Sequence, residues 1–167
     1  GEGGGFSNPA IYRHYENKDA LIRDVIRESY AVFKSYLFDA ADVEAPRARL
    51  DATVAAALRF ALDYPHDYEL LFFSPHRLVI DRYPEDFRKG KSTGFRFLAE
   101  LVRVCLPRAR ARADLATDAA LTIVAHMHGL VILHQTGRFN DDPAVFKRFF
   151  GRSMRLVLAG VLGKGMH

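Results

Sequence analysis

The chain has 167 residues, a length that suits one domain or a small module joined to a larger one. A hydrophobic share of 49% with 12% aromatic residues is enough for a substantial core and excludes an intrinsically disordered chain. The net charge of +4 at pH 7 is compatible with nucleic-acid binding but does not by itself demonstrate it.

Residues 7–21 contain two helix starts that lie almost back to back. Ser7 or Asn8 can cap a first helix, and Asn17 can cap a second one. The first helix has room for about two turns and carries Tyr, Arg, His and Tyr in succession at positions 12–15. Such polar and aromatic groups are poorly suited to a core, and they favour a DNA groove or a phosphate backbone as partner.

The segment 11–21 reads Ile-Tyr-Arg-His-Tyr-Glu-Asn-Lys-Asp-Ala-Leu. It resembles, without a gap, the end of the DNA-binding domain in the tetracycline-repressor-like (TetR) family of bacterial transcription regulators. There the recognition helix runs into an apolar residue, Tyr, any residue, His, an aromatic residue, two linker residues, Lys, an acidic residue, any residue and Leu. The resemblance implies that the groove is contacted by Asn8, Pro9, Ala10 and Arg13. It implies that phosphates are anchored by Tyr12, His14 and Lys18.

The same resemblance implies an all-α, TetR-like fold. The helices that precede the recognition helix in a helix-turn-helix domain are expected upstream of Ser7. Residues 1–17 are therefore expected to be the C-terminal remnant of that domain. Residues 18–167 are expected to hold a linker helix followed by a C-terminal ligand-binding and dimerisation domain.

Residues 17–39 place apolar side chains at offsets of three and four, which predicts a long amphipathic helix. In the family, this helix joins the DNA-binding and ligand-binding domains. The next helix is predicted from Pro46 to about Tyr64, where Pro65 ends it, with Phe60 on a different side from its apolar stripe. That stripe consists of Leu50, Val54, Leu58, Ala61 and Leu62.

A short helix is predicted from His66 to about Phe73, followed by an irregular connection over 76–83. Pro84 begins a further helix that could extend to Leu106. Two glycines weaken that helix and are compatible with a kink or a break: Gly90 and Gly94.

The most apolar helix is predicted over 114–137, where apolar residues surround nearly the whole circumference. The last helix follows Asp142 and also has a wide apolar stripe. Helices this apolar must be enclosed, so we expect a homodimer that pairs through these two helices in a four-helix interface. The segment 126–138, with its His-Gly pair, apolar run and Gly-Arg, also resembles a TetR subfamily.

His126 and His128 lie two residues apart, about 200° around a helix, so they cannot chelate one ion together. His126 with Gln135, or His134 with a residue of another helix, could still contribute to a metal site. No Glu-x-x-His pattern or cysteine pair supports one, and we expect no metal or cofactor. No nucleophile elbow, phosphate loop or dinucleotide fingerprint is present, so we do not expect an enzyme.

A cavity with apolar walls and a few polar groups suits a small hydrophobic or amphipathic effector. The helices that should converge on such a cavity in the family fold carry several candidate residues, although for any one of them simple core filling is the favoured interpretation. These candidates are Phe60, Tyr64, Phe72, Phe73, Phe95, Met127 and His134.

We therefore expect a DNA-binding transcriptional regulator, a repressor that a small effector releases from its operator. The alternative is a helical dimer that binds a small ligand and has no role at DNA. A single cysteine, Cys105, indicates no internal disulfide, and the longest apolar run, 121–133, is short for a bilayer span. We expect a cytoplasmic protein without a membrane partner.

Overall fold

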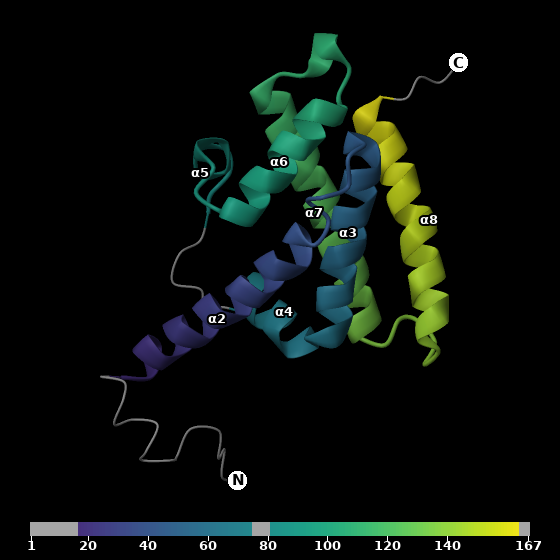
Figure 1. Ribbon diagram of the computed structural model, residues 1–167. Helices are drawn as coiled ribbons and strands as arrows, with labels where there is room; N and C mark the ends of the chain where they lie inside the picture. Colours follow the sequence, from purple (N-terminus) through teal and green to yellow (C-terminus); the bar gives the residue numbers. More distant parts are fainter. Residues whose placement is uncertain (1–16, 75–80, 164–167) are drawn as a thin grey trace.

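The computed structural model describes residues 17–74 and 81–163, which form helices and no strand (Figure 1). The helices are α2 (Lys18–Phe38), α3 (Pro46–Asp63), α4 (Pro65–Phe72), α5 (Glu85–Lys89), α6 (Thr93–Cys105), α7 (Ala113–Gln135) and α8 (Pro143–Leu162), with a 3-10 turn at Arg108–Arg110. The all-α expectation is confirmed. The connection predicted over 76–83 falls largely outside the described residues.

Side-chain caps begin three of the helices. The side chain of Asn17 accepts a hydrogen bond from the Ala20 amide at 2.9 Å, and Asp142 accepts one from the Ala144 amide at 2.9 Å. Ser92 does the same for the start of α6. These bonds satisfy amides that have no partner within the helix, and they therefore stabilise the helix starts. The helix starts predicted at Asn17 and Asp142 are confirmed.

The segment from Pro84 to Leu106, in which Gly90 and Gly94 were compatible with a kink or a break, forms two helices, and the break lies at Gly90. Gly90 has a left-handed backbone with φ of 64°, which ends α5 and which only glycine adopts without strain. Gly94 does not break the chain but lies inside the first turn of α6. A Cβ atom there would lie only 3.0 Å from the Tyr30 hydroxyl, so Gly94 permits a close approach between α2 and α6.

Phe60 does not point away from the core, as its separation from the apolar stripe of α3 suggested. Its side chain is completely buried, whereas Leu58 and Leu62 of the stripe are only partly buried. The reason is that α3 contacts α2, α4 and α6, so it has more than one buried face. A pattern that assumes one buried face per helix misplaces such a residue.

Helix α7 packs against both α6 and α8, and it supplies much of the hydrophobic core. Its length and apolar composition would allow it to cross a membrane, but an 18-residue window of it is 44% buried inside the protein. It is the one helix in the described ranges that meets this test, and the core helix of a bundle meets it too. Two large apolar residues near its end, Ile132 and Leu133, are 40% and 43% exposed.

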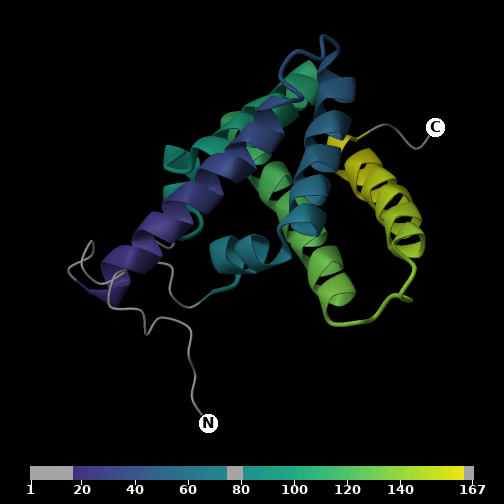
Figure 2. The same cartoon turned by 60° about the horizontal axis from the view of Figure 1, so that its bottom comes forward.

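Helix α2 crosses the bundle diagonally, and its first turns project beyond the other helices in both views (Figures 1 and 2). Most side chains from Lys18 to Glu28 are exposed or partly exposed, while Phe33 and Leu37 near its other end are buried. The second half of α2 is therefore part of the core, and its beginning is an arm directed away from it.

Candidate ligand-binding cavity

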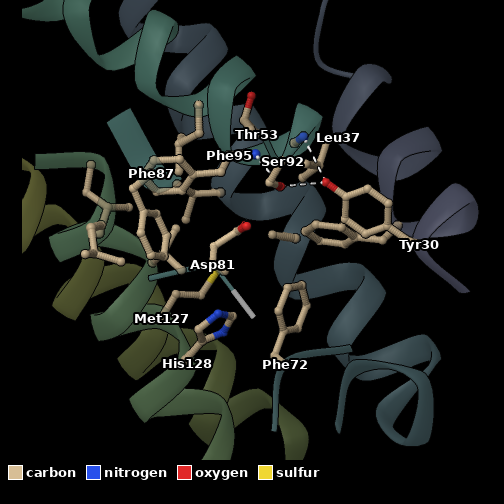
Figure 3. Close-up of a pocket in the computed structure, with 18 residues that line it drawn as sticks. Tyr30, Leu37, Thr53, Phe72, Asp81, Phe87, Ser92, Phe95, Met127 and His128 are labelled. Atoms are coloured by element: carbon tan, nitrogen blue, oxygen red, sulfur yellow. Dashed lines mark hydrogen bonds between the residues drawn. The ribbon is translucent and has the colours of Figure 1, made fainter. Parts of the chain in front are cut away.

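A cavity of about 250 Å³ lies between α2, α3, α4, α6 and α7 (Figure 3). Most of its wall is apolar or aromatic, which matches the usual chemistry of a small-molecule site. The apolar and aromatic lining residues are Tyr30, Phe33, Leu37, Val54, Ala57, Phe72, Phe87, Phe95, Leu98, Leu121, Ile123, Val124 and Met127.

Helical spacing explains how α2 reaches this wall. Tyr30, Phe33 and Leu37 are three and four residues apart, so they share one face of the helix. Phe33 packs edge-on against Phe60, with ring centroids 5.1 Å apart, and against Phe72 at 5.2 Å. Aromatic residues of three helices therefore form one cluster, in which Phe33 and Phe72 line the cavity and Phe60 lies behind Phe33.

One end of the cavity is polar. The Tyr30 hydroxyl lies 2.8 Å from the Ser92 hydroxyl and accepts a hydrogen bond from the Gly94 amide at 3.0 Å. Since Ser92 also caps α6, this group of hydrogen bonds connects α2 directly to the first turn of α6 (Figure 3). A ligand that reached this end would meet the contact between the two helices.

A second polar contact lies where α4 faces α7. The hydroxyl of Tyr68 forms a short hydrogen bond with Nδ1 of His128, whose ring also packs against Phe72 with centroids 4.6 Å apart. Tyr68 is fully buried, and this burial raises the pKa of its phenol, so the hydroxyl keeps its proton. The His128 ring lines the cavity while Tyr68 lies behind it.

Three of the seven predicted pocket residues line the cavity: Phe72, Phe95 and Met127. Phe60 lies in the layer behind Phe33, and Phe73 contacts the His128 ring from outside the cavity, with centroids 5.5 Å apart.

The other two predicted residues lie elsewhere. Tyr64 is 42% exposed at the end of α3. His134 stacks on Phe146 of α8, with ring centroids 4.1 Å apart and planes inclined by 4°. The residues of α7 that line the cavity end at His128, and His134 lies more than one helical turn beyond it. His134 therefore does not reach the cavity.

Five polar lining residues were not selected from the sequence: Tyr30, Thr53, Asp81, Ser92 and His128. The position of Tyr30, three residues before Phe33 on the predicted apolar face of α2, was an available signal. Asp81 had no comparable signal, because it precedes α5 in a segment without periodicity.

Of the predicted DNA contacts, only Lys18 belongs to the described residues. It is the first residue of α2 and is exposed. The others lie outside the described residues: Asn8, Pro9, Ala10, Tyr12, Arg13 and His14.

Two of the three histidines considered as metal ligands form hydrogen bonds to other side chains. Nε2 of His126 lies 2.8 Å from the Ser153 hydroxyl of α8, and His128 bonds to Tyr68 as described above. Within residues 17–74 and 81–163, no group of three His, Cys, Asp or Glu side chains could hold a metal ion.

Helix α8 has an apolar outer face that its own chain does not cover. Leu156 is 76% exposed and Phe149 is 39% exposed, and the two residues lie on the same side of the helix. Each of these two helices also has a glycine with open space beside it: a Cβ atom added at Gly160 of α8 or at Gly129 of α7 would contact nothing within 4 Å. A second helix could therefore approach both backbones closely.

The family described as "Tetracyclin repressor-like, C-terminal domain" matches residues 50–157, which is more than half of the chain. Among solved structures, the chain is similar to the crystal structure of a candidate regulatory protein, SCO4313, with a TM-score of 0.67 and 24% sequence identity. That similarity covers 90% of this chain and 78% of the other, and it shows a shared fold. A search of curated proteins found no match.

Proposed function

Because the chain belongs to the tetracycline-repressor-like family of regulators, we propose that it is a DNA-binding repressor that a small molecule releases from its operator. Transcription regulation is the role this family membership indicates. The proposal adds three parts to it: an effector in the cavity between α2 and α7, contacts to operator DNA before and at the start of α2, and pairing of two copies through α7 and α8.

The observation that supports the proposal is that α2 forms one wall of the cavity and begins next to the segment that resembles a recognition helix. Its second half forms a wall of the cavity through Tyr30, Phe33 and Leu37. Its first residue, Lys18, directly follows the segment that resembles a recognition helix. A rigid helix of this length transmits a displacement at one end to the other.

Hydrogen bonds hold α2 against three neighbouring helices. Besides the contact of Tyr30 with α6, the Ser29 hydroxyl donates to Asp67 of α4. The Tyr36 hydroxyl donates to Asp63 at the end of α3, at 2.7 Å. An effector that shifts α4 or α6 would change the direction of α2.

A change in the direction of α2 would affect DNA binding, because a dimer presents two recognition helices. They must reach successive major grooves about 34 Å apart. A small rotation of each α2 alters this separation, and operator affinity falls by linkage between the two sites. We assign the direct contacts to Asn8, Pro9, Ala10 and Arg13 in the groove, and to Tyr12, His14 and Lys18 at phosphates.

Pairing through the outer faces of α7 and α8 supplies the cover that these helices lack in one chain. The exposed Leu156 and Phe149 would be buried against the partner copy, and the open surfaces at Gly129 and Gly160 allow close helix packing. We propose that the protein is a cytoplasmic homodimer and not an enzyme.

A gel shift with the full-length gene product tests the proposal, using the DNA that adjoins its own gene and scrambled DNA of the same length. We expect a shift with the first and a much weaker one with the second. Equal, weak binding to both would instead favour a ligand-binding dimer without a role at DNA.

The Lys18→Ala variant tests the phosphate contact separately. Removal of one phosphate contact should weaken binding to all sequences alike and reduce the slope of log affinity against log salt by about one per site. Glu28→Ala on the same helix, which removes an exposed charge far from the start of α2, is the control. A salt slope equal to that of the unmodified protein would contradict the role of Lys18.

A further inference from the structure

The cavity wall contains one carboxylate, that of Asp81 (Figure 3). Within the described residues, this carboxylate has no hydrogen bond and no ion pair closer than 4 Å. Several carboxylates elsewhere in the structure do have such partners, as when Asp86 pairs with Lys91 at 2.6 Å. An ionised group in an apolar surrounding is costly unless a charge of opposite sign accompanies it.

Aromatic rings surround the same space. Phe72, Phe87 and Phe95 line the cavity, and the rings of Phe87 and Phe95 meet edge-on with centroids 4.9 Å apart. The face of an aromatic ring carries partial negative charge and attracts cations. The rings and the carboxylate therefore favour the same sign of charge in a ligand.

Basic side chains lie on the outer side of this site, and one of them, Lys91, also interacts electrostatically with Asp81. A shallower hollow shares Tyr30, Phe72, Asp81 and Ser92 with the cavity and is also lined by three basic residues. These are Arg23, Arg27 and Lys91. Arg27 pairs with Asp24 at 2.7 Å and Lys91 with Asp86, while Arg23 is exposed to water, where salt screens its charge.

The volume limits the size of the ligand. An apolar cavity of about 150 Å³ holds a benzene molecule in a worked case from another protein. A cavity of about 250 Å³ therefore has room for a benzene ring with a substituent of several heavy atoms.

We propose that the effector is a small organic cation, a protonated amine or a quaternary ammonium joined to an apolar body, with Asp81 as its counter-ion. This proposal rests on the proposed function only in taking the cavity as the effector site.

Two probes of equal shape and different charge test it: phenyltrimethylammonium and its neutral isostere tert-butylbenzene. Binding to the full-length gene product is measured by titration calorimetry and by the ligand-induced rise in melting temperature. We expect the cation to bind more tightly. Asp81→Asn, which keeps the shape of the side chain, should lower cation affinity by about tenfold or more and leave the neutral probe unchanged.

Glu85→Gln is the matched control, because Glu85 is an exposed carboxylate near Asp81 that does not line the cavity. It should leave both affinities unchanged. Equal binding of the two probes, with no effect of Asp81→Asn, would overturn the cation proposal while leaving the cavity as an effector site. Binding of neither probe would also overturn it, and the gel shift described above would still decide the proposed function separately.

Discussion

His134 shows how a single side chain depends on its surroundings more than on its place in a helix. Its ring stacks on Phe146, and its Nδ1 atom is buried without a hydrogen-bond partner among the described residues. Burial lowers the pKa of His134 below its ordinary value of 6.5, because a protonated ring would lose its hydration there.

This predicts a loss of stability in acid. Since the folded-state pKa lies below 6.5, the unfolded chain binds the proton first, and the free energy of unfolding should decline as the pH falls from about 6.5. The variant His134→Phe keeps the stacking and removes the proton site, so its advantage over the unmodified protein should grow from pH 8 to pH 5. Urea unfolding at both pH values measures it.

The exposed His66 supplies the control for this experiment. His66→Gln should retain the decline of the unmodified protein. A constant difference between His134→Phe and the unmodified protein across this pH range would contradict the account.

A pocket residue could be predicted from the sequence only where it lies both on a helix that borders the cavity and at the right distance along that helix. Phe72, Phe95 and Met127 lie on stretches of α4, α6 and α7 that converge. His134 lies on the right helix but too far along it. Residue type alone could not reveal this difference, because aromatic and imidazole groups fill cores and line cavities equally well.

Among the elements, α2 is held in place by side-chain hydrogen bonds to three neighbours, α3, α4 and α6. The Tyr30 hydroxyl serves both the Ser92 hydroxyl and the Gly94 amide. We predict that Tyr30→Phe lowers the free energy of unfolding by about 1–2 kcal/mol, because it leaves the Gly94 amide without its partner.

Tyr83→Phe is the matched control for that substitution. Its hydroxyl donates to Asp118 at 2.9 Å, but Tyr83 is 51% exposed, so water replaces the lost bond. The change should be about 0.5 kcal/mol or less. Equal losses in the two variants, measured by denaturant unfolding, would show that the Tyr30 contact has no special importance.

Most helix boundaries could be predicted because local chemistry sets them. Asn17 and Pro46 begin helices by mechanisms that act within a few residues. The break at Gly90 was harder to place, because glycine at position 94 gave the same local signal. Only the packing of Gly94 against Tyr30 distinguishes the two, and that contact joins residues 64 positions apart.

At the scale of the whole molecule, the exposed apolar face of α8 predicts the oligomeric state. Leu156→Glu should convert a dimer into a monomer in sedimentation experiments and leave the helical content unchanged, because the side chain is 76% exposed within one chain. Val104→Glu, on α6 and 52% exposed, introduces the same charge away from this face and should leave the dimer intact. A monomer in the unmodified protein would contradict the proposed pairing.

The central claim is that cavity and operator are linked through α2. Linkage is reciprocal, so one measurement with two halves tests it. The first half is the operator affinity of the full-length gene product with and without a saturating cavity ligand. The second half is the affinity for that ligand with and without operator. The account predicts that each partner weakens the other by the same factor, in the range of about 5- to 150-fold. A ligand that fills the cavity and leaves operator affinity unchanged would contradict it.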